Sequence, residues 1–467
     1  MNKEYIRLKK TTVLFAATSI AAKALKIIVI PLFTYYITTE QFGVAETVVI
    51  TATLLSPVAM LGTNVAAIRF LLKDSCNKDV VVSNCFILVA ITAFPMFLIC
   101  LSMKHFEMFR GYNGLIWLIV MALAAEGIFL SFSVGLNNNK AYAFSEIVRT
   151  TVFAIFGLVF LIVFRGGIKG YLWAVVIASI ARCLYIGSRL RISRYIKVAS
   201  VNRNTIKELL KYSLPLVPAA MMWWVIDSSD RYIIMYLLDA SSVGIYAIAC
   251  RLSAVITGIS AIFHQAWMLS AIREYNEKDY KSFYCDTLQY YSGFLFVTAT
   301  LLIALIRPAM IVFDKEYVDA WRYAPLLIIA MVFLALSSFE DANYIANKKT
   351  SGVMTTAFVG AASNIAMNIV LTKVFGLYGT AAATLIAYYL VWLIRYKHTA
   401  RIIGSSTNLV AVHINLLIVA SETMLLLEEH GYIPILICLV ACVIVNRKNI
   451  ERIVCGLRGL ITTGGEE

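Results

Sequence analysis

The sequence carries very little charge for its length. Asp, Glu, Lys and Arg make up 15% of its 467 residues, whereas 60% are hydrophobic and the mean hydropathy is +0.79. Soluble domains carry about 25% charged residues, so this composition excludes a soluble globular protein. The short alternating segments of an outer-membrane barrel are also missing. The sequence therefore predicts an all-α polytopic membrane protein, because a helix satisfies its own backbone hydrogen bonds in lipid.

Signatures of metal binding and catalysis are missing as well. The nine Cys and five His residues are scattered, and none stand at metal-ligand spacing. Cys438 and Cys442 are one helical turn apart, a spacing more typical of packing than of a metal site. No catalytic group of residues is visible. We therefore expect no cofactor, no metal and no enzymatic activity.

Apolar windows long enough to cross a bilayer are frequent in the sequence. Fourteen are found, at about 11–37, 43–72, 80–103, 114–136, 142–164, 170–189, 213–238, 243–270, 286–306, 322–345, 352–372, 378–398, 407–427 and 432–446. With the N-terminus in the cytoplasm, 26 of the 41 Lys and Arg residues fall on inner segments, 8 on outer segments and 7 within helices. This asymmetry follows the positive-inside rule and explains the net charge of +14 without a nucleic-acid partner. About 14 transmembrane helices with both termini cytoplasmic are predicted.

Two parts of the chain match at an offset of 209 positions. The matching pairs are Asn138 with Asn347, Lys140 with Lys349, Gly167 with Gly376, Gly170 with Gly379, Ala174 with Ala383 and Ala178 with Ala387. Each copy would hold six helices, an even number, so the copies would have the same orientation in the membrane. The starts of the copies, Tyr36–Gly43 and Tyr236–Gly244, are alike with a one-residue difference in length.

The repeat and the charges predict five parts. These are an N-terminal lobe of six helices (1–189), a basic cytoplasmic linker (190–212), a C-terminal lobe of six helices (213–405), two further helices (406–446) and a cytoplasmic tail (447–467).

Several cations lie inside the predicted helices. An ionised side chain near the bilayer centre costs roughly 2.5–3.5 kcal/mol, so each needs a reason. Lys23 and Lys26 share one face of the first window, and Arg251 lies about a third of the way into the 243–270 window. Arg182 lies near the inner end of its window, where it either reaches the cytoplasm or has a function. Together they predict a cationic cavity for an anionic group such as pyrophosphate or an acidic sugar.

Acidic residues also lie inside the predicted helices. Glu126 is near the middle of the 114–136 window, and Asp227, Asp230 and Arg231 cluster in the 213–238 window. The i, i+4 spacing of Asp227 and Arg231 fits either a structural ion pair or a role in coupling and gating. Three other residues are expected to have no special role: Glu340 and Asp341 at a solvated helix end, and His264 as a packed polar group.

Short motifs along the chain resemble those of one family. They are Asp230-Arg231-Tyr232, Val243-Gly244-Ile245-Tyr246-Ala247, the pair Phe263 and Trp267, and Phe375-Gly376-Leu377-Tyr378-Gly379. Their order and spacing over nearly the whole chain resemble the polysaccharide biosynthesis proteins. These are the Wzx-type lipid-linked oligosaccharide flippases of the MATE-like multidrug/oligosaccharidyl-lipid/polysaccharide exporter superfamily. Leu269 stands where such proteins often have proline.

The resemblance implies a flippase in the bacterial cytoplasmic (inner) membrane. It would move undecaprenyl-pyrophosphate-linked oligosaccharide units by alternating access, for O-antigen, capsule or exopolysaccharide synthesis. By analogy, the residues that meet pyrophosphate or acidic glycan would be Lys23, Lys26, Arg251 and Arg182. The residues that couple or gate transport would be Asp227, Asp230, Arg231 and Glu126. Partners would be the lipid-linked oligosaccharide, membrane lipids, and the polymerase and chain-length proteins of the same pathway.

Two other functions are alternatives to this one. A MATE-type proton- or sodium-coupled drug or cation antiporter would have the same fold, but it would favour acids in an otherwise uncharged cavity. The excess of positive charge at Lys23, Lys26 and Arg251 disfavours it. An enzyme of the same pathway, such as a polymerase, would have a large outer loop. The longest outer loops expected here, near 104–113 and 307–321, are too short.

Overall fold

The structure is a computed structural model, and it consists of helices and turns. It describes Thr18, 21–22, Leu25, 28–72, 77–275, Glu277, 279–347, 351–404, 409–447 and Asn449. No β-strand occurs among these residues, in agreement with the predicted all-α class. They form two compact units. One holds the described residues up to Met235 with Asp239–Gly244, and the other holds Tyr236–Leu238 and the described residues from Ile245 onward.

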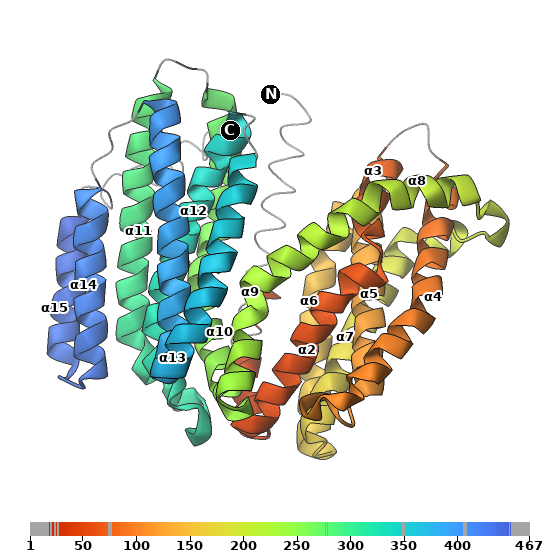
Figure 1. Ribbon diagram of the computed structural model, residues 1–467, viewed down its shortest axis with the longest axis horizontal. Helices are drawn as coiled ribbons and strands as arrows, with labels where there is room; N and C mark the ends of the chain where they lie inside the picture. Colours follow the sequence, from red (N-terminus) through yellow and green to blue (C-terminus); the bar gives the residue numbers. More distant parts are fainter. Residues whose placement is uncertain are drawn as a thin grey trace, which may run out of the picture. The chain divides into compact units, whose positions relative to one another are not determined.

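The first unit is a helical bundle (Figure 1). Its helices are α2 (Thr39–Ala59), α3 (Thr63–Leu71), α4 (Lys78–Ser102), α5 (Asn113–Gly135), α6 (Asn139–Leu158), α7 (Gly167–Leu190), α8 (Arg203–Ser213) and α9 (Val217–Leu237). α5 packs against α2, α3 and α7, and α7 also packs against α6. The buried faces are dominated by Ala, Val, Ile and Phe side chains. This packing brings α5, α6 and α7 together, which positions the charged cluster described below.

The predicted span at 43–72 is two helices, so the prediction of a single helix was wrong. α2 ends at Ala59, and Leu61 and Gly62 have φ angles of 52° and 65° before α3 begins. Left-handed backbone cannot continue a right-handed helix. Ser213 stabilises the break, since its hydroxyl donates to the carbonyl oxygen of Leu61 at 2.7 Å.

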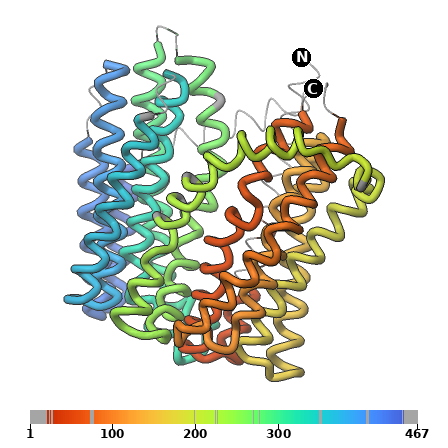
Figure 2. Tube along the Cα trace, turned by 45° about the vertical axis from the view of Figure 1, so that its right-hand side comes forward, coloured from red at the N-terminus to blue at the C-terminus, as the bar shows by residue number. Residues whose placement is uncertain are grey.

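The predicted linker at 190–212 contains α8. Figures 1 and 2 show α8 across the ends of α3 and α4, with which it packs. Arg69 of α3 lies over the ring of Tyr212, 4.4 Å from its centroid. Leu209 and Ser213 are the α8 residues that are buried. A helix with so narrow a buried face gives no membrane-length apolar window, so the hydropathy pattern missed it.

Packing places α9 with the first unit. The indole nitrogen of Trp224 donates to the carbonyl oxygen of Ile50 and to Oγ1 of Thr53, both at 3.0 Å. The hydroxyl of Tyr232 is hydrogen-bonded to Thr51. The sequence instead placed this helix in the C-terminal lobe, and a lobe boundary at 190–212 stays a prediction.

The second unit is built on α10 from Ile245 onward and on α11 to α15. The bounds are α10 (Ala240–Glu274), α11 (Tyr280–Ala309), α12 (Ala320–Ala346), α13 (Ser351–Ile403), α14 (Val410–Leu427) and α15 (Tyr432–Val445). α12 packs against α11 and α13, and Figure 1 shows α14 and α15 side by side near α11. Asn415 and Asn446 join α14 to the end of α15 by reciprocal amide hydrogen bonds of 3.2 and 2.8 Å. Such amide pairs hold helices together in lipid.

The 209-residue offset has a counterpart in the backbone. Gly376 has φ 59° and ψ −139° and divides α13 into two limbs, which match the predicted spans at 352–372 and 378–398. Gly167, its partner in the repeat, has φ 50° at the start of α7. A Cβ on Gly170 would lie 3.1 Å from Cβ of Phe160, and one on Gly379 would lie 1.9 Å from the carbonyl oxygen of Leu371. Both copies thus use glycine for left-handed backbone and for close helix approach.

The chain is a multi-pass membrane protein. In the described part, ten helices are long and apolar enough to cross a membrane, or eleven with the bent pair Arg203–Met222 and Asp227–Leu237. This number includes α13 once, although α13 contains two predicted spans. It does not include α15, because α15 has 14 residues and is shorter than the other spans. The window at 11–37 lies largely outside the described residues. Fourteen spans and cytoplasmic termini therefore stay predictions.

Candidate functional site

Four charged side chains meet where α5, α6 and α7 pack together. Glu126 of α5 is 6% exposed and accepts hydrogen bonds from Nη1 of Arg182 at 2.7 Å and from Nε of Arg149 at 3.2 Å. Arg182 Nη1 also lies 2.9 Å from Oε2 of Glu146, and its Nε donates to Ser145 Oγ at 3.0 Å. The two guanidinium groups and two carboxylates balance one another, which lowers the cost of burying each charge.

This cluster joins two residues for which the sequence predicted separate roles. Arg182 was expected to bind substrate or to reach the cytoplasm, and Glu126 to couple transport. Arg182 is 6% exposed and hydrogen-bonded within the bundle, so protein groups rather than water surround its guanidinium. Arg149 and Glu146 were not predicted as site residues. Their opposite charges, spaced i, i+3 in an apolar window, are the signal that could have found them.

The predicted cluster in α9 is present, with different contacts. Nη1 of Arg231 donates to the main-chain carbonyl oxygen of Asp227 at 2.7 Å and forms an ion pair with Oδ1 of Asp230 at 2.8 Å. Asp230 is buried and also accepts from the main-chain nitrogen of Arg231 at 2.9 Å. The Asp227 side chain is exposed. Arg231 therefore contacts Asp227, four positions earlier, through its main-chain oxygen. Its ion pair is formed with the adjacent residue, Asp230.

The predicted substrate-binding cations are described only in part. Lys23 and Lys26 lie outside the described residues. Arg251 lies on α10 in the second unit, half-buried. A cationic cavity formed by these residues stays a prediction.

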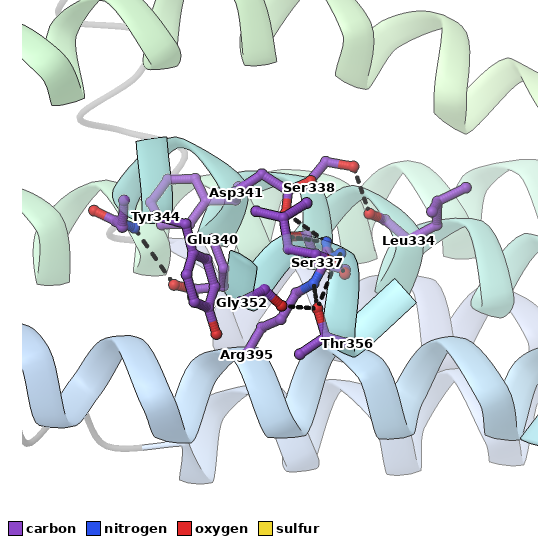
Figure 3. A network of polar contacts seen from close by, with 12 residues as sticks. Leu334, Ser337, Ser338, Glu340, Asp341, Tyr344, Gly352, Thr356 and Arg395 are labelled. Atoms are coloured by element: carbon purple, nitrogen blue, oxygen red, sulfur yellow. Dashed lines mark hydrogen bonds and ion pairs between the residues drawn. The ribbon is translucent and has the colours of Figure 1, made fainter. Parts of the chain in front are cut away.

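A second polar cluster lies between α11, α12 and α13. Glu340 of α12 has no exposed surface, and the hydroxyl of Tyr284 donates to its Oε1 at 2.9 Å and its Oε2 at 3.1 Å. Nδ2 of Asn343 donates to Oε2 at 3.4 Å, and Asn343 in turn accepts from Tyr280. Figure 3 shows Glu340 beside Asp341 and Arg395. The prediction of a solvated Glu340 was wrong, because α12 continues to Ala346 and is covered by α11 and α13.

Arg395 of α13 organises the rest of this cluster (Figure 3). It is 4% exposed, and its Nη1 forms an ion pair with Oδ1 of Asp341 at 2.7 Å. Nε donates to Thr356 Oγ1 at 2.9 Å, Nη1 to Ser337 Oγ at 2.9 Å, and Nη2 to the carbonyl oxygen of Val353 at 3.3 Å. The 26 cations counted above on inner segments include Arg395, whereas the structure places it inside α13 and buries it, so that assignment was wrong. The position of Arg395 inside the apolar window at 378–398 is the feature of the sequence that could have indicated its burial.

These clusters share a chemical character. Each combines carboxylates and guanidinium groups inside a bundle of apolar helices. In the described part of the chain, no group of three or more His, Cys, Asp or Glu side chains could hold a metal ion. The geometry is suited to holding helices in defined positions and to exchanging protons.

Solved structures of transporters have the same fold. The chain aligns with the lipid II flippase MurJ, in an inward closed conformation, at a TM-score of 0.70 and 16% identity, covering 95% of this chain and 99% of that one. It aligns with an inward-facing multidrug resistance MATE family transporter of the MOP superfamily at a TM-score of 0.62 and 14% identity, covering 83% and 98%. At these identities the likeness concerns the fold.

Sequence comparison gives the family. An uncharacterized membrane protein of Methanocaldococcus jannaschii, MJ1068, is 24% identical over 312 residues, which are 61% of this chain. The chain spans 60% of the length of that relative. The family model for polysaccharide biosynthesis proteins matches residues 7–268, more than half of the chain. The protein therefore belongs to the polysaccharide biosynthesis protein family, as the motifs predicted.

Proposed function

We propose that this protein is a flippase for lipid-linked oligosaccharides. Its substrate would be an undecaprenyl-pyrophosphate-linked glycan repeat unit, moved across the bacterial cytoplasmic membrane for surface polysaccharide synthesis. The observation that carries the proposal is the family match over residues 7–268 in a multi-pass chain. The fold shared with a lipid II flippase supports it. Polymerase and chain-length proteins of the same pathway would act on the product.

The proposed contacts with the substrate follow from charge. Lys23, Lys26 and Arg251 would pair with the pyrophosphate or with acidic sugars, because guanidinium and ammonium groups bind phosphate oxygens strongly. To bind the substrate, Arg182 would have to break its ion pairs with Glu126 and Glu146. We therefore assign to it the holding of α5, α6 and α7 in register. Asp227 and the Asp230–Arg231 pair would gate access as two lobes alternate.

The alternative is a MATE-type drug or cation antiporter. The likeness to a MATE transporter concerns the fold, which both functions share. The family match and the cations at Lys23, Lys26 and Arg251 favour an anionic, lipid-linked substrate. A transport assay that compares both substrate classes separates the two.

The test is transport by the purified protein in liposomes. A lipid-linked oligosaccharide with a pyrophosphate linker is placed in the inner leaflet, and its arrival outside is measured by an impermeant glycosidase. We expect transport by the wild type and loss of transport in the double variant Lys23→Ala with Lys26→Ala. The matched control is Lys104→Ala with Lys169→Ala, which removes two exposed lysines elsewhere in the first unit.

Two results would contradict the proposal. Transport of cationic drugs but not of the lipid-linked oligosaccharide by the wild type would favour the antiporter. Unchanged transport in the Lys23 and Lys26 variant would remove these residues from the pyrophosphate site. Size-exclusion chromatography of each variant shows that a loss of transport is not a loss of folding.

A further inference from the structure

Glu340 differs from the neighbouring Asp341, which is paired with Arg395, because no cation pairs with Glu340 among the described residues. The nearby guanidinium of Arg395 is already engaged, with Asp341 at 2.7 Å and with hydroxyls of Ser337 and Thr356 at 2.9 Å. Two carboxyl groups therefore share a buried cluster with one guanidinium. An unpaired charge in a membrane interior is costly, so the ionised form of Glu340 depends on hydrogen-bond donors around its carboxyl group.

The groups around Glu340 fit a proton rather than a metal ion. The hydroxyl of Tyr284 and the amide nitrogen of Asn343 both point hydrogen-bond donors at the carboxyl oxygens. Hard cations need several oxygen ligands with free lone pairs, and donors exclude them. Donors can instead stabilise the ionised carboxylate, while burial opposes it. Opposing effects of this kind permit a carboxyl group to gain and lose a proton.

Each helix of the cluster contributes titratable or charged groups. α10 contributes His264, which interacts electrostatically with Asp341 and whose Nε2 has no hydrogen-bond partner in the described part of the chain. The others are Tyr280, Tyr284 and Cys285 on α11, Asp341 and Tyr344 on α12, and Arg395, Tyr396 and His398 on α13. Arg395 offsets Asp341, and Tyr344 is hydrogen-bonded to His398 at 2.9 Å. Glu340 is thus the carboxyl group of this cluster without a fixed counter-ion among the described residues.

We propose that Glu340 is the residue where this transporter binds and releases the proton that drives transport. In one state Glu340 is neutral and its helices pack closely. In the other state it is a carboxylate held by Tyr284 and Asn343, after its proton has passed to water. This inference rests on the proposed function, since a driving proton requires transport. It adds a residue in the second unit to the coupling acids that the sequence suggested.

Infrared spectroscopy of the purified protein tests proton binding without transport. We expect a carbonyl band of a protonated buried carboxyl group that disappears as pH rises, and its loss in Glu340→Gln. The matched control is Glu422→Gln, because Glu422 of α14 is equally buried and its carboxyl oxygens have no hydrogen-bond partner in the described part of the chain. The titrating band persists in that control. A titrating band that is unchanged in Glu340→Gln overturns the proposal.

Tyr284→Phe is a second, milder variant. It removes the donor to Glu340 and keeps the ring, so the midpoint of the titrating band moves to higher pH by about one unit, the equivalent of one hydrogen bond to a charged group. An unmoved midpoint overturns the assignment of the band to Glu340.

Transport under an imposed pH gradient tests the coupling. We expect wild-type transport and Glu422→Gln transport to change with the gradient, and Glu340→Gln to transport equally with and without it. A gradient response in Glu340→Gln that equals the wild type overturns the proposal. A wild type that moves no lipid-linked oligosaccharide overturns the proposed function instead, and the infrared experiment still decides whether Glu340 exchanges a proton.

Discussion

Thr39 and Ser241 are 202 positions apart in the sequence, and their side-chain oxygens lie 2.7 Å apart. Both belong to the first unit, Thr39 at the start of α2 and Ser241 at the start of α10. Glycines on either side make the approach possible. A Cβ on Gly43 would lie 1.8 Å from the carbonyl oxygen of Ala240, and one on Gly244 would lie 2.1 Å from that of Thr39. Residues 39–43 and 240–244, which lie in the two stretches that resemble each other in sequence, therefore pack closely against each other.

The first prediction concerns this contact. Gly43→Ala and Gly244→Ala each place a methyl group on main-chain atoms that cannot rotate away, so each lowers stability by about 1–3 kcal/mol. Thermal unfolding in detergent measures the effect. The control is Gly114→Ala in α5, where a Cβ meets no atom within 4 Å. Equal stability of Gly43→Ala and the control would contradict the close approach.

The second prediction concerns the charged cluster of α5, α6 and α7. Arg182→Met leaves Glu126 and Glu146 short of a cation and lowers stability by about 3–5 kcal/mol. Adding Glu126→Gln removes one of those charges, so the double variant is more stable than the sum of the single effects predicts, by about 0.5–3 kcal/mol. Arg189→Ala, at an exposed position of the same helix, is the control. Additive effects would show that Arg182 and Glu126 do not interact.

The third prediction concerns Arg395. Arg395→Ala lowers stability by about 3–5 kcal/mol because it leaves the half-buried Asp341 carboxylate and the buried hydroxyls of Ser337 and Thr356 without their partner. Arg395→Lys keeps the charge but cannot reach Thr356, Ser337 and Asp341 with one nitrogen, so it recovers only part of the loss. Unfolding in detergent again gives the readout, and Lys397→Ala, exposed two positions further on, is the control. Full recovery with lysine would mean that charge alone matters.

The fourth prediction compares glycines of the repeat. Gly376→Ala and Gly167→Ala force alanine to a positive φ angle, which costs about 1–3 kcal/mol at each site. Gly379→Ala is more destabilising, because its Cβ would lie 1.9 Å from a main-chain oxygen, whereas nothing lies within 4 Å of a Cβ on Gly376. The order of unfolding temperatures checks this. A Gly379→Ala variant as stable as Gly376→Ala would contradict the close approach of Gly379 to Leu371.

The class of protein and much of its repeat can be predicted from the sequence alone. Long apolar runs dictate membrane helices because lipid offers the backbone no other hydrogen-bond partner. Gly167 and Gly376 matched in sequence because both copies need left-handed backbone at the same turn. The motifs predicted the family, which the match over residues 7–268 confirmed.

The contacts between the buried charges depend on how the helices pack. Glu126 contacts Arg149 and Arg182, which are 23 and 56 positions away, and these contacts depend on how three helices are rotated against one another. No local spacing encodes that rotation. The same reason explains why Glu340 looked like a solvated helix end, yet is covered by neighbouring helices and held by Tyr284. Hydropathy gives where a helix crosses the membrane, whereas packing decides which of its side chains are buried and with which partners.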